Sequence, residues 1–163
     1  MGSTLTVDNI QGATTAGTVH MPAGHVVQVV EYRDNGNYTN SSTSFAQASQ
    51  TGTFTLKNSS NKVLVTVNCL TRAQRSSASG IRLAIYRGSV ASGTRITSGS
   101  EPQVYSTDSG TEQYNINMLQ ILDTPAAAST TYSLALQKHS SSGDVHIYGS
   151  FFQTIITMQE ISV

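Results

Sequence analysis

The fold is decided by the stretch Lys62-Val63-Leu64-Val65-Thr66-Val67-Asn68-Cys69-Leu70. Every odd position in it is apolar, whereas the even positions mix leucine with threonine and asparagine. Side chains that alternate with a period of two point to opposite faces of a β-strand. The stretch therefore predicts a strand with one face in a core. It also places Cys69 in that core, as a small apolar residue rather than a reactive thiol.

The same alternation recurs along most of the chain. The run Ile81-Arg82-Leu83-Ala84-Ile85-Tyr86-Arg87 turns Ile81, Leu83 and Ile85 to one face. Further strands are predicted at residues 26–32, 53–56, 103–106, 114–122, 131–137, 145–148 and 152–162. Clusters of Gly, Ser, Asn, Asp and Pro separate these segments, as turns require. About eight short strands joined by turns predict an all-β fold, an antiparallel β-sandwich or jelly roll.

Residues 112–122 fit two kinds of element. Tyr114, Met118 and Ile121 also match helical spacing. The apolar residues at every second position from 114 to 118 alternate with asparagine, however, and this alternation favours a strand. The polar segment 72–80 and the Gly- and Ser-rich segment 88–99 are predicted to be loops.

The first 25 residues differ from the rest. The run from Thr4 to Ile10 alternates, but the whole segment has too few apolar residues to close a core of its own. It is either a swapped or docked strand or an arm that orders on a partner, and the arm is favoured. We therefore divide the chain into an N-terminal attachment arm, residues 1–25, and a jelly-roll-like β-sandwich, residues 26–163. The side chains expected to attach the arm to a particle are Leu5, Val7, Ile10, Val19 and Met21.

The composition excludes several classes of protein. Nine Lys and Arg balance nine Asp and Glu among 163 residues, and charged residues are 11% of the chain against about 25% in an ordinary domain. A nucleic-acid binder normally has a basic excess, and none exists here. No apolar run approaches the roughly 18 residues of a membrane span. Zero net charge leaves little repulsion between copies, which favours self-association or a place in an assembly.

No group of residues predicts catalysis or a bound metal. His20, His25, His139 and His146 lack the spacing of a metal site, although His139 and His146 flank a turn and could face each other across a hairpin. No nucleophile elbow is present. We therefore predict no catalytic residue, no metal and no cofactor, and so a protein that is not an enzyme.

The acidic residues fall mostly in predicted turns, where carboxylates normally bond to nearby backbone amides. Glycoside hydrolysis needs two carboxylates across one cleft. Because the acidic residues of this chain are scattered over turns, a polysaccharide-degrading enzyme is the weakest alternative. Aromatic residues at the predicted strand ends have two interpretations, packing at the strand end or contact with a sugar or protein, and packing is favoured. They are Tyr32, Tyr38, Phe151 and Phe152.

Several segments together resemble structural proteins of tailed bacteriophages that infect cyanobacteria and other aquatic bacteria. The opening Leu5-Thr6-Val7-Asp8-Asn9-Ile10-Gln11 is similar to the "L-x-V-D-x-I-Q" start of such virion proteins. Similar elements follow in the family's order over nearly the whole chain: 24–30, 60–67, the "R-L-x-R-x-G" strand at 81–88, the "L-D-S-P" element at 122–134 and the closing strand at 155–161.

This resemblance implies a virion location, with synthesis in the host cytoplasm, and a homotrimer whose N-terminal segment attaches it to the major capsid protein or another virion protein. The expected role is a capsid decoration or cement protein. The alternative is a host-binding knob of a short tail or head fibre. Such a knob would contact a host-surface glycan or protein through the loops at 72–80, 88–100 and 140–144. No nucleic acid and no membrane are expected as partners.

Overall fold

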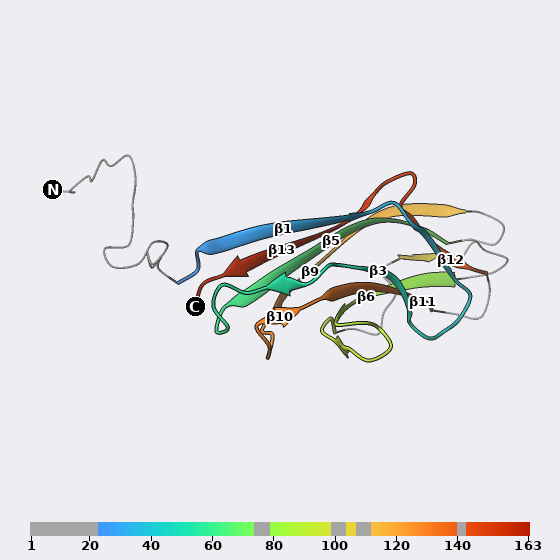
Figure 1. Ribbon diagram of the computed structural model, residues 1–163. Helices are drawn as coiled ribbons and strands as arrows, with labels where there is room; N and C mark the ends of the chain where they lie inside the picture. Colours follow the sequence, from blue (N-terminus) through green and yellow to red (C-terminus); the bar gives the residue numbers. More distant parts are fainter. Residues whose placement is uncertain (1–22, 74–78, 99–103, 107–111, 140–142) are drawn as a thin grey trace, which may run out of the picture.

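The computed structural model describes residues 23–73, 79–98, 104–106, 112–139 and 143–163 (Figure 1). Within these ranges the chain forms thirteen β-strands. They are β1 (Val26–Asp34), β2 (Asn37–Asn40), β3 (Ala46–Gln50), β4 (Phe54–Thr55), β5 (Lys62–Ala73), β6 (Ser79–Arg87), β7 (Thr94–Arg95), β8 (Val104–Ser106), β9 (Gln113–Asp123), β10 (Ser129–Thr130), β11 (Tyr132–Lys138), β12 (Val145–Tyr148) and β13 (Thr154–Ile161). No helix in this part of the chain is long and apolar enough to cross a membrane.

Sheet A is built around the long central strand β5. One edge of β5 pairs with β13 over its first half and with β12 near its end, and the other edge pairs with β9. Next to β13 and β12 lie β1 and β2. All these pairs are antiparallel, and the long strands β1, β13 and β5 run side by side along the molecule (Figure 1). β9 and β1 are therefore the two outermost long strands of sheet A.

Sheet B covers one face of sheet A. Its order is β3-β11-β6-β7, with β8 also pairing with β6, and a separate two-stranded ribbon joins β4 to β10. Buried apolar side chains of both sheets form one cluster, which includes Val65 and Ile156 of sheet A and Leu83 and Leu134 of sheet B. The predicted all-β antiparallel sandwich is confirmed.

The core follows the predicted alternation. Val63, Val65, Val67 and Cys69 are completely buried, and the residues between them are half-buried on the outer face. On β6, the inward residues Ile81, Leu83 and Ile85 are likewise buried, as predicted. Each of these residues removes apolar surface from water, which is the main favourable contribution to folding.

Two glycines allow β1 to continue as β2 beside the turn between β12 and β13. The backbone N–H of Gly149 donates to the carbonyl of Gly36 at 3.1 Å. A Cβ at residue 149 would lie 2.4 Å from that carbonyl oxygen, so a side chain has no room there. Glycine at this position permits the close approach of the two turns.

Several predictions need correction. Residues 112–122 form a strand, as favoured, but the predicted loop 72–80 begins too early, because Arg72 belongs to β5 and Ser79 to β6. The predicted loop 88–99 contains the short strand β7. His139 and His146 do not face each other across a hairpin. β11, which ends just before His139, lies in sheet B, whereas β12, which holds His146, lies in sheet A.

Candidate functional site

Most of the large exposed apolar side chains of the described residues lie on the two outermost strands of sheet A. β9 contributes Tyr114, Ile116, Met118 and Leu122. β1 contributes four valines, of which Val30 lies on the side of sheet B, because its register partner Met158 is buried in the core. Single exposed apolar residues are ordinary on a protein surface, but a row of them along one strand marks a contact surface. The candidate functional site is therefore the outer face of sheet A, the face that is turned away from sheet B.

The first half of β9 turns its apolar side chains outward and its asparagines inward, whereas Leu119 and Ile121 farther along the strand face the core. The exposed fractions along the outward row are 51% for Tyr114, 66% for Ile116, 69% for Met118 and 50% for Leu122. On the inward side, the Asn117 amide donates to the Thr71 hydroxyl at 2.7 Å and to a neighbouring backbone carbonyl. Because this amide finds partners inside, burial of the asparagine is tolerated and the apolar row remains on the surface.

β9 is also an edge strand. It pairs with β5 at every position from Gln113 to Asp123 and with no other described strand. Natural proteins usually protect such an edge with lysine, proline or a β-bulge, because its unpaired backbone groups attract other strands. β9 contains no Lys, Arg or Pro, and its register with β5 is unbroken. A long, apolar and unprotected edge is suited to being covered by another chain.

The strands beside β9 extend this apolar surface. Leu70 of β5 lies opposite Ile116, and Leu64 lies opposite Leu122. Between these pairs, the Gln120 amide donates to the Thr66 hydroxyl at 3.1 Å. The outer face thus combines aliphatic side chains with uncharged polar groups that are already bonded to one another.

Both arginines on this face pair with glutamates. Arg33 contacts the Glu31 carboxylate at 2.6 Å, and Arg72 forms an ion pair with Glu112. Of these two pairs, only Arg33–Glu31 is exposed on both sides, and such a pair contributes at most about 1 kcal/mol to stability. Their more important effect is that the face carries little net charge, so it does not repel a similar face.

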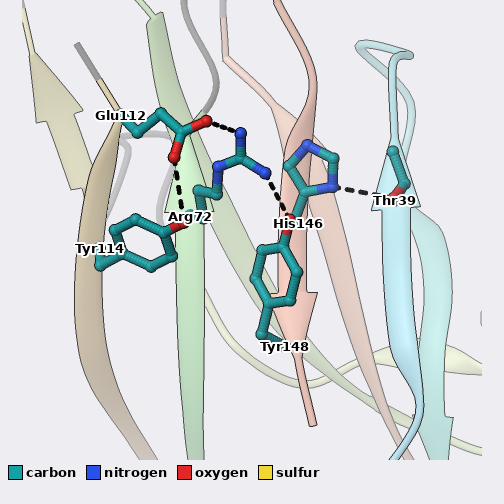
Figure 2. A network of polar contacts seen from close by, with 6 residues as sticks. All are labelled: Thr39, Arg72, Glu112, Tyr114, His146 and Tyr148. Carbon is teal, nitrogen blue, oxygen red and sulfur yellow. Dashed lines mark hydrogen bonds and ion pairs between the residues drawn. The ribbon is translucent and has the colours of Figure 1, made fainter. Parts of the chain in front are cut away.

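A cluster of aromatic and polar side chains occupies one end of the outer face (Figure 2). The strand register aligns Tyr114, Arg72, His146 and Thr39 in one row across four strands. Arg72 donates to Glu112 and to the Tyr148 hydroxyl, and its guanidinium lies 5.9 Å from the Tyr114 ring centroid and 5.7 Å from that of Tyr148. These contacts fix the arginine between two rings.

The cluster contains one histidine. The His146 ring stacks on Tyr148 with 5.6 Å between centroids, and its Nδ1 lies 2.9 Å from the Thr39 hydroxyl. Burial lowers the pKa of His146 below its ordinary value, and the nearby Arg72 charge lowers it further, against an opposing effect of Asp144. The imidazole is therefore neutral at pH 7, and the cluster offers stacking surfaces and a hydrogen-bonded cation.

The buried carboxylates have structural partners. Asp123 accepts two hydrogen bonds from Arg87, at 2.8 and 3.0 Å, and one from the Tyr132 hydroxyl at 2.9 Å. This arrangement links the end of β9 to sheet B. Asp34 accepts from the backbone N–H of Gly36 at 2.7 Å, as predicted for a turn acid.

Glu160 closes the other end of sheet A. It accepts hydrogen bonds from the Gln28 amide at 2.6 Å, from the Asn61 amide at 2.7 Å and from the backbone N–H groups of Lys57 and Asn58. Burial raises its pKa, but these donors outweigh burial and hold the pKa below its ordinary value of 4.5. The carboxylate is therefore ionised at neutral pH and holds the 57–61 turn against β13.

Other predicted site residues are placed as follows. Cys69 is completely buried, and burial raises its pKa to about 12, which confirms that it is a core residue. No three His, Cys, Asp or Glu side chains of the described ranges lie together as a metal site needs. The attachment residues Leu5, Val7, Ile10, Val19 and Met21, as well as His20, lie outside the described residues, so the arm stays a prediction.

The residues predicted to bind a host include Arg72, as the first residue of the predicted loop 72–80, but not the outward row of β9 or the rest of the cluster. The available signal was the uncharged alternation of residues 113–122, which lacks the lysine or proline expected on an edge strand. Of the predicted strand-end aromatics, Phe151 is 79% exposed and lies 5.8 Å from the Tyr148 ring, beside the cluster.

The chain matches no protein-family model, and no curated protein is significantly similar to it. Three solved structures of infectious bursal disease virus are similar in fold. The Gx strain structure is 10% identical, with a TM-score of 0.44, over 100% of this chain and 42% of that chain. The Gt strain structure is 12% identical, with a TM-score of 0.45, over 94% of this chain and 42% of that chain. The VP2 subviral particle is 12% identical, with a TM-score of 0.39, over 83% of this chain and 37% of that chain.

This chain therefore spans about two-fifths of the length of those viral chains. At these identities the likeness is one of fold alone.

Proposed function

We propose that this protein is a structural component of a bacteriophage particle, a trimeric capsid decoration or cement protein anchored through its N-terminal arm. The observation that carries the proposal is the outward apolar row of β9, which lies on an unprotected edge strand. Such a surface suits permanent contact with other protein chains. The sequence resemblance to phage virion proteins supports the phage and the decoration role.

The size of the outer face fits a contact between subunits. Eleven residues of β9 span about 36 Å, and the four long strands are about 15–20 Å wide at the usual strand spacing. The face therefore covers roughly 600 Å², close to the roughly 800 Å² that each partner contributes to a standard stable interface. Three copies that meet through such faces would bury their apolar rows away from water.

Charge favours a second copy as the partner. The protein has no net charge, and the ion pairs Arg33–Glu31 and Arg72–Glu112 lie within the outer face itself. A strongly charged face would repel a copy of itself, whereas this one does not. The proposed trimer therefore needs no charged partner to neutralise its interface.

The arm supplies the attachment to the shell. The described chain starts beside the free end of sheet A, where the Gly24 N–H donates to the Ser162 carbonyl at 2.8 Å. The preceding residues include Leu5, Val7 and Ile10. Burying an aliphatic side chain yields about 1.5–3 kcal/mol before the entropy of ordering the chain is subtracted. Three arms in one trimer would multiply weak contacts through effective concentration.

The test is attachment of full-length and shortened protein to particles. Deletion of residues 1–22 should leave a folded trimer with the wild-type melting temperature, because Gly24 and the rest of the sandwich are retained. The shortened protein should no longer bind particles of the parent phage from which the native protein has been stripped. On intact particles, gel staining should show a copy number on the scale of the major shell protein. Full binding by the shortened protein would contradict the arm.

The second candidate function is a host-binding knob of a short tail or head fibre. It is favoured by a depression lined by Arg82 and Arg95 on the outer face of sheet B, on the opposite side of the molecule from the apolar row. A knob would be present in few copies per particle, so the same copy-number measurement separates it from a cement protein.

A further inference from the structure

The outer face of sheet B has a different chemistry from that of sheet A. The alternation that buries Ile81, Leu83 and Ile85 turns Arg82, Ala84 and Tyr86 outward. Across the sheet, β11 places Gln137 opposite Arg82 and Ala135 opposite Ala84. On the other side of β6, β7 places Arg95 opposite Tyr86.

These positions form a depression of about 450 Å³. Its lining includes Arg82 and Gln137 from one row, Tyr86 and Arg95 from another, and Phe45 from the segment before β3. Between the two rows, the side chains of Ala84 and Ala135 are themselves buried beneath their neighbours. The volume falls in the range of pockets that bind small molecules.

Among the described residues, neither arginine of the depression has an acidic partner. Arg33, Arg72 and Arg87 each form an ion pair within the described residues, but Arg82 and Arg95 form none there. The Arg82 Nε is buried and has no hydrogen-bond partner. An unpaired donor of this kind is costly to bury and gains energy when an anion binds.

Aromatic rings lie beside these cations. The Phe45 and Tyr86 rings meet edge to face with 6.1 Å between centroids, and the Arg95 guanidinium lies 5.6 Å from the Phe45 ring centroid. The Gln137 amide donates to the Thr43 carbonyl, so its carbonyl oxygen is directed to accept from another group. The two arginines, the two aromatic rings and the Gln137 amide therefore surround one depression.

We propose that this depression binds an acidic saccharide, a sugar unit that carries a carboxylate. The carboxylate lies between Arg82 and Arg95, because guanidinium groups match carboxylate oxygens in planar, charge-assisted hydrogen bonds. The less polar face of the sugar ring packs on Tyr86, and its hydroxyls bond to the Gln137 amide and to the hydroxyls at the rim. This binding goes beyond the shell-binding role and is measurable on the free protein.

The test uses the ¹⁵N-labelled full chain and three probes: trigalacturonate, the neutral sugar maltotriose and sodium sulfate. Trigalacturonate should shift amide resonances of β6, β7 and β11, and maltotriose should bind about tenfold or more weakly. The variant Arg82→Gln/Arg95→Gln should lose trigalacturonate affinity by about tenfold or more while its spectrum stays dispersed. Arg33→Gln, on the opposite face, is the matched control and should bind as the wild type does.

Three results would overturn the proposal. The first is no shift with millimolar trigalacturonate. The second is unchanged affinity in the double arginine variant. The third is equal affinity for sulfate at the same resonances, because that result describes a simple anion site. None of these results depends on particle attachment or on the trimer, so they leave the cement role to its own test.

Discussion

The outer faces of the two sheets result from the same alternation but differ in chemistry. Sheet A exposes an uncharged apolar row on β9, and its arginines at the surface pair with glutamates. Sheet B places Arg82 and Arg95 on one depression, and neither has an acidic partner among the described residues. A neutral apolar face suits contact with a copy of itself, whereas a cationic depression suits an anionic ligand. The comparison shows that the side chains on the outer face of a sheet decide which partner the sheet can bind.

The largest expected effect comes from a substitution in the core that the two sheets share, because it removes both outer faces along with the fold. Val65 is completely buried on β5, in the cluster that both sheets share. Val65→Asp places an unpaired charge there, at a cost that rivals the roughly 5–15 kcal/mol by which a domain is stable. We expect loss of the folded state, measured as loss of cooperative unfolding by circular dichroism.

The neighbouring residue provides the matched control. Thr66 lies on the outer face of sheet A, beside Gln120. Thr66→Asp should leave each copy folded but weaken the contact between copies, because it adds a charge to the apolar face. Cooperative unfolding of Val65→Asp at the wild-type midpoint would show that the two faces of β5 have been assigned wrongly.

A smaller loss of stability is expected when the polar contact that joins the two sheets is weakened. Asp123 ends β9 in sheet A and bonds to Arg87 and Tyr132 of sheet B. Asp123→Asn removes the charge that Arg87 faces, and hydrogen bonds to charged groups contribute about 1.5–3 kcal/mol. We expect the free energy of unfolding to fall by about 2–4 kcal/mol in urea titrations. A loss below about 0.5 kcal/mol would mean that the pair does not join the sheets.

The smallest effect concerns one end of sheet A and depends on pH. Since the pKa of Glu160 is lowered in the folded state, its ionised form stabilises the fold above pH 4.5, and this stabilisation is lost as pH falls through the folded-state pKa. Glu160→Gln should lower the melting temperature at pH 7, and the difference from wild type should narrow below pH 4.5. A difference that stays constant from pH 7 to pH 3 would contradict the role of the charge.

The core could be predicted from the sequence because its strands carry unmixed apolar faces. β5 and β6 have three or more apolar residues at alternate positions, and burial follows them. β2 and β3 were missed because Asn37–Asn40 and Ala46–Gln50 are polar, and their pairing depends on partners far along the chain. Tertiary pairing overrides local preference in such segments.

The surface sites were less predictable for a related reason. In the first half of β9 the rule that apolar residues face inward fails, because Asn117 is satisfied by Thr71 inside the sandwich. The placement of Arg82 and Arg95 on one depression depends on the pairing of β6 with β7, and no local pattern encodes that pairing. The pairing of Arg87 with Asp123 joins residues 36 positions apart.

The central claim is that the outer face of sheet A joins copies of this chain, and the molar mass of the free protein tests it most directly. Light scattering after gel filtration should give the wild type three times the 17.3 kDa of one chain. Met118→Glu should give 17.3 kDa, whereas Tyr105→Glu, at a similarly exposed position on sheet B, should keep the wild-type mass. A wild-type protein with the mass of one chain, or a Met118→Glu variant that retains the full mass, would contradict the claim.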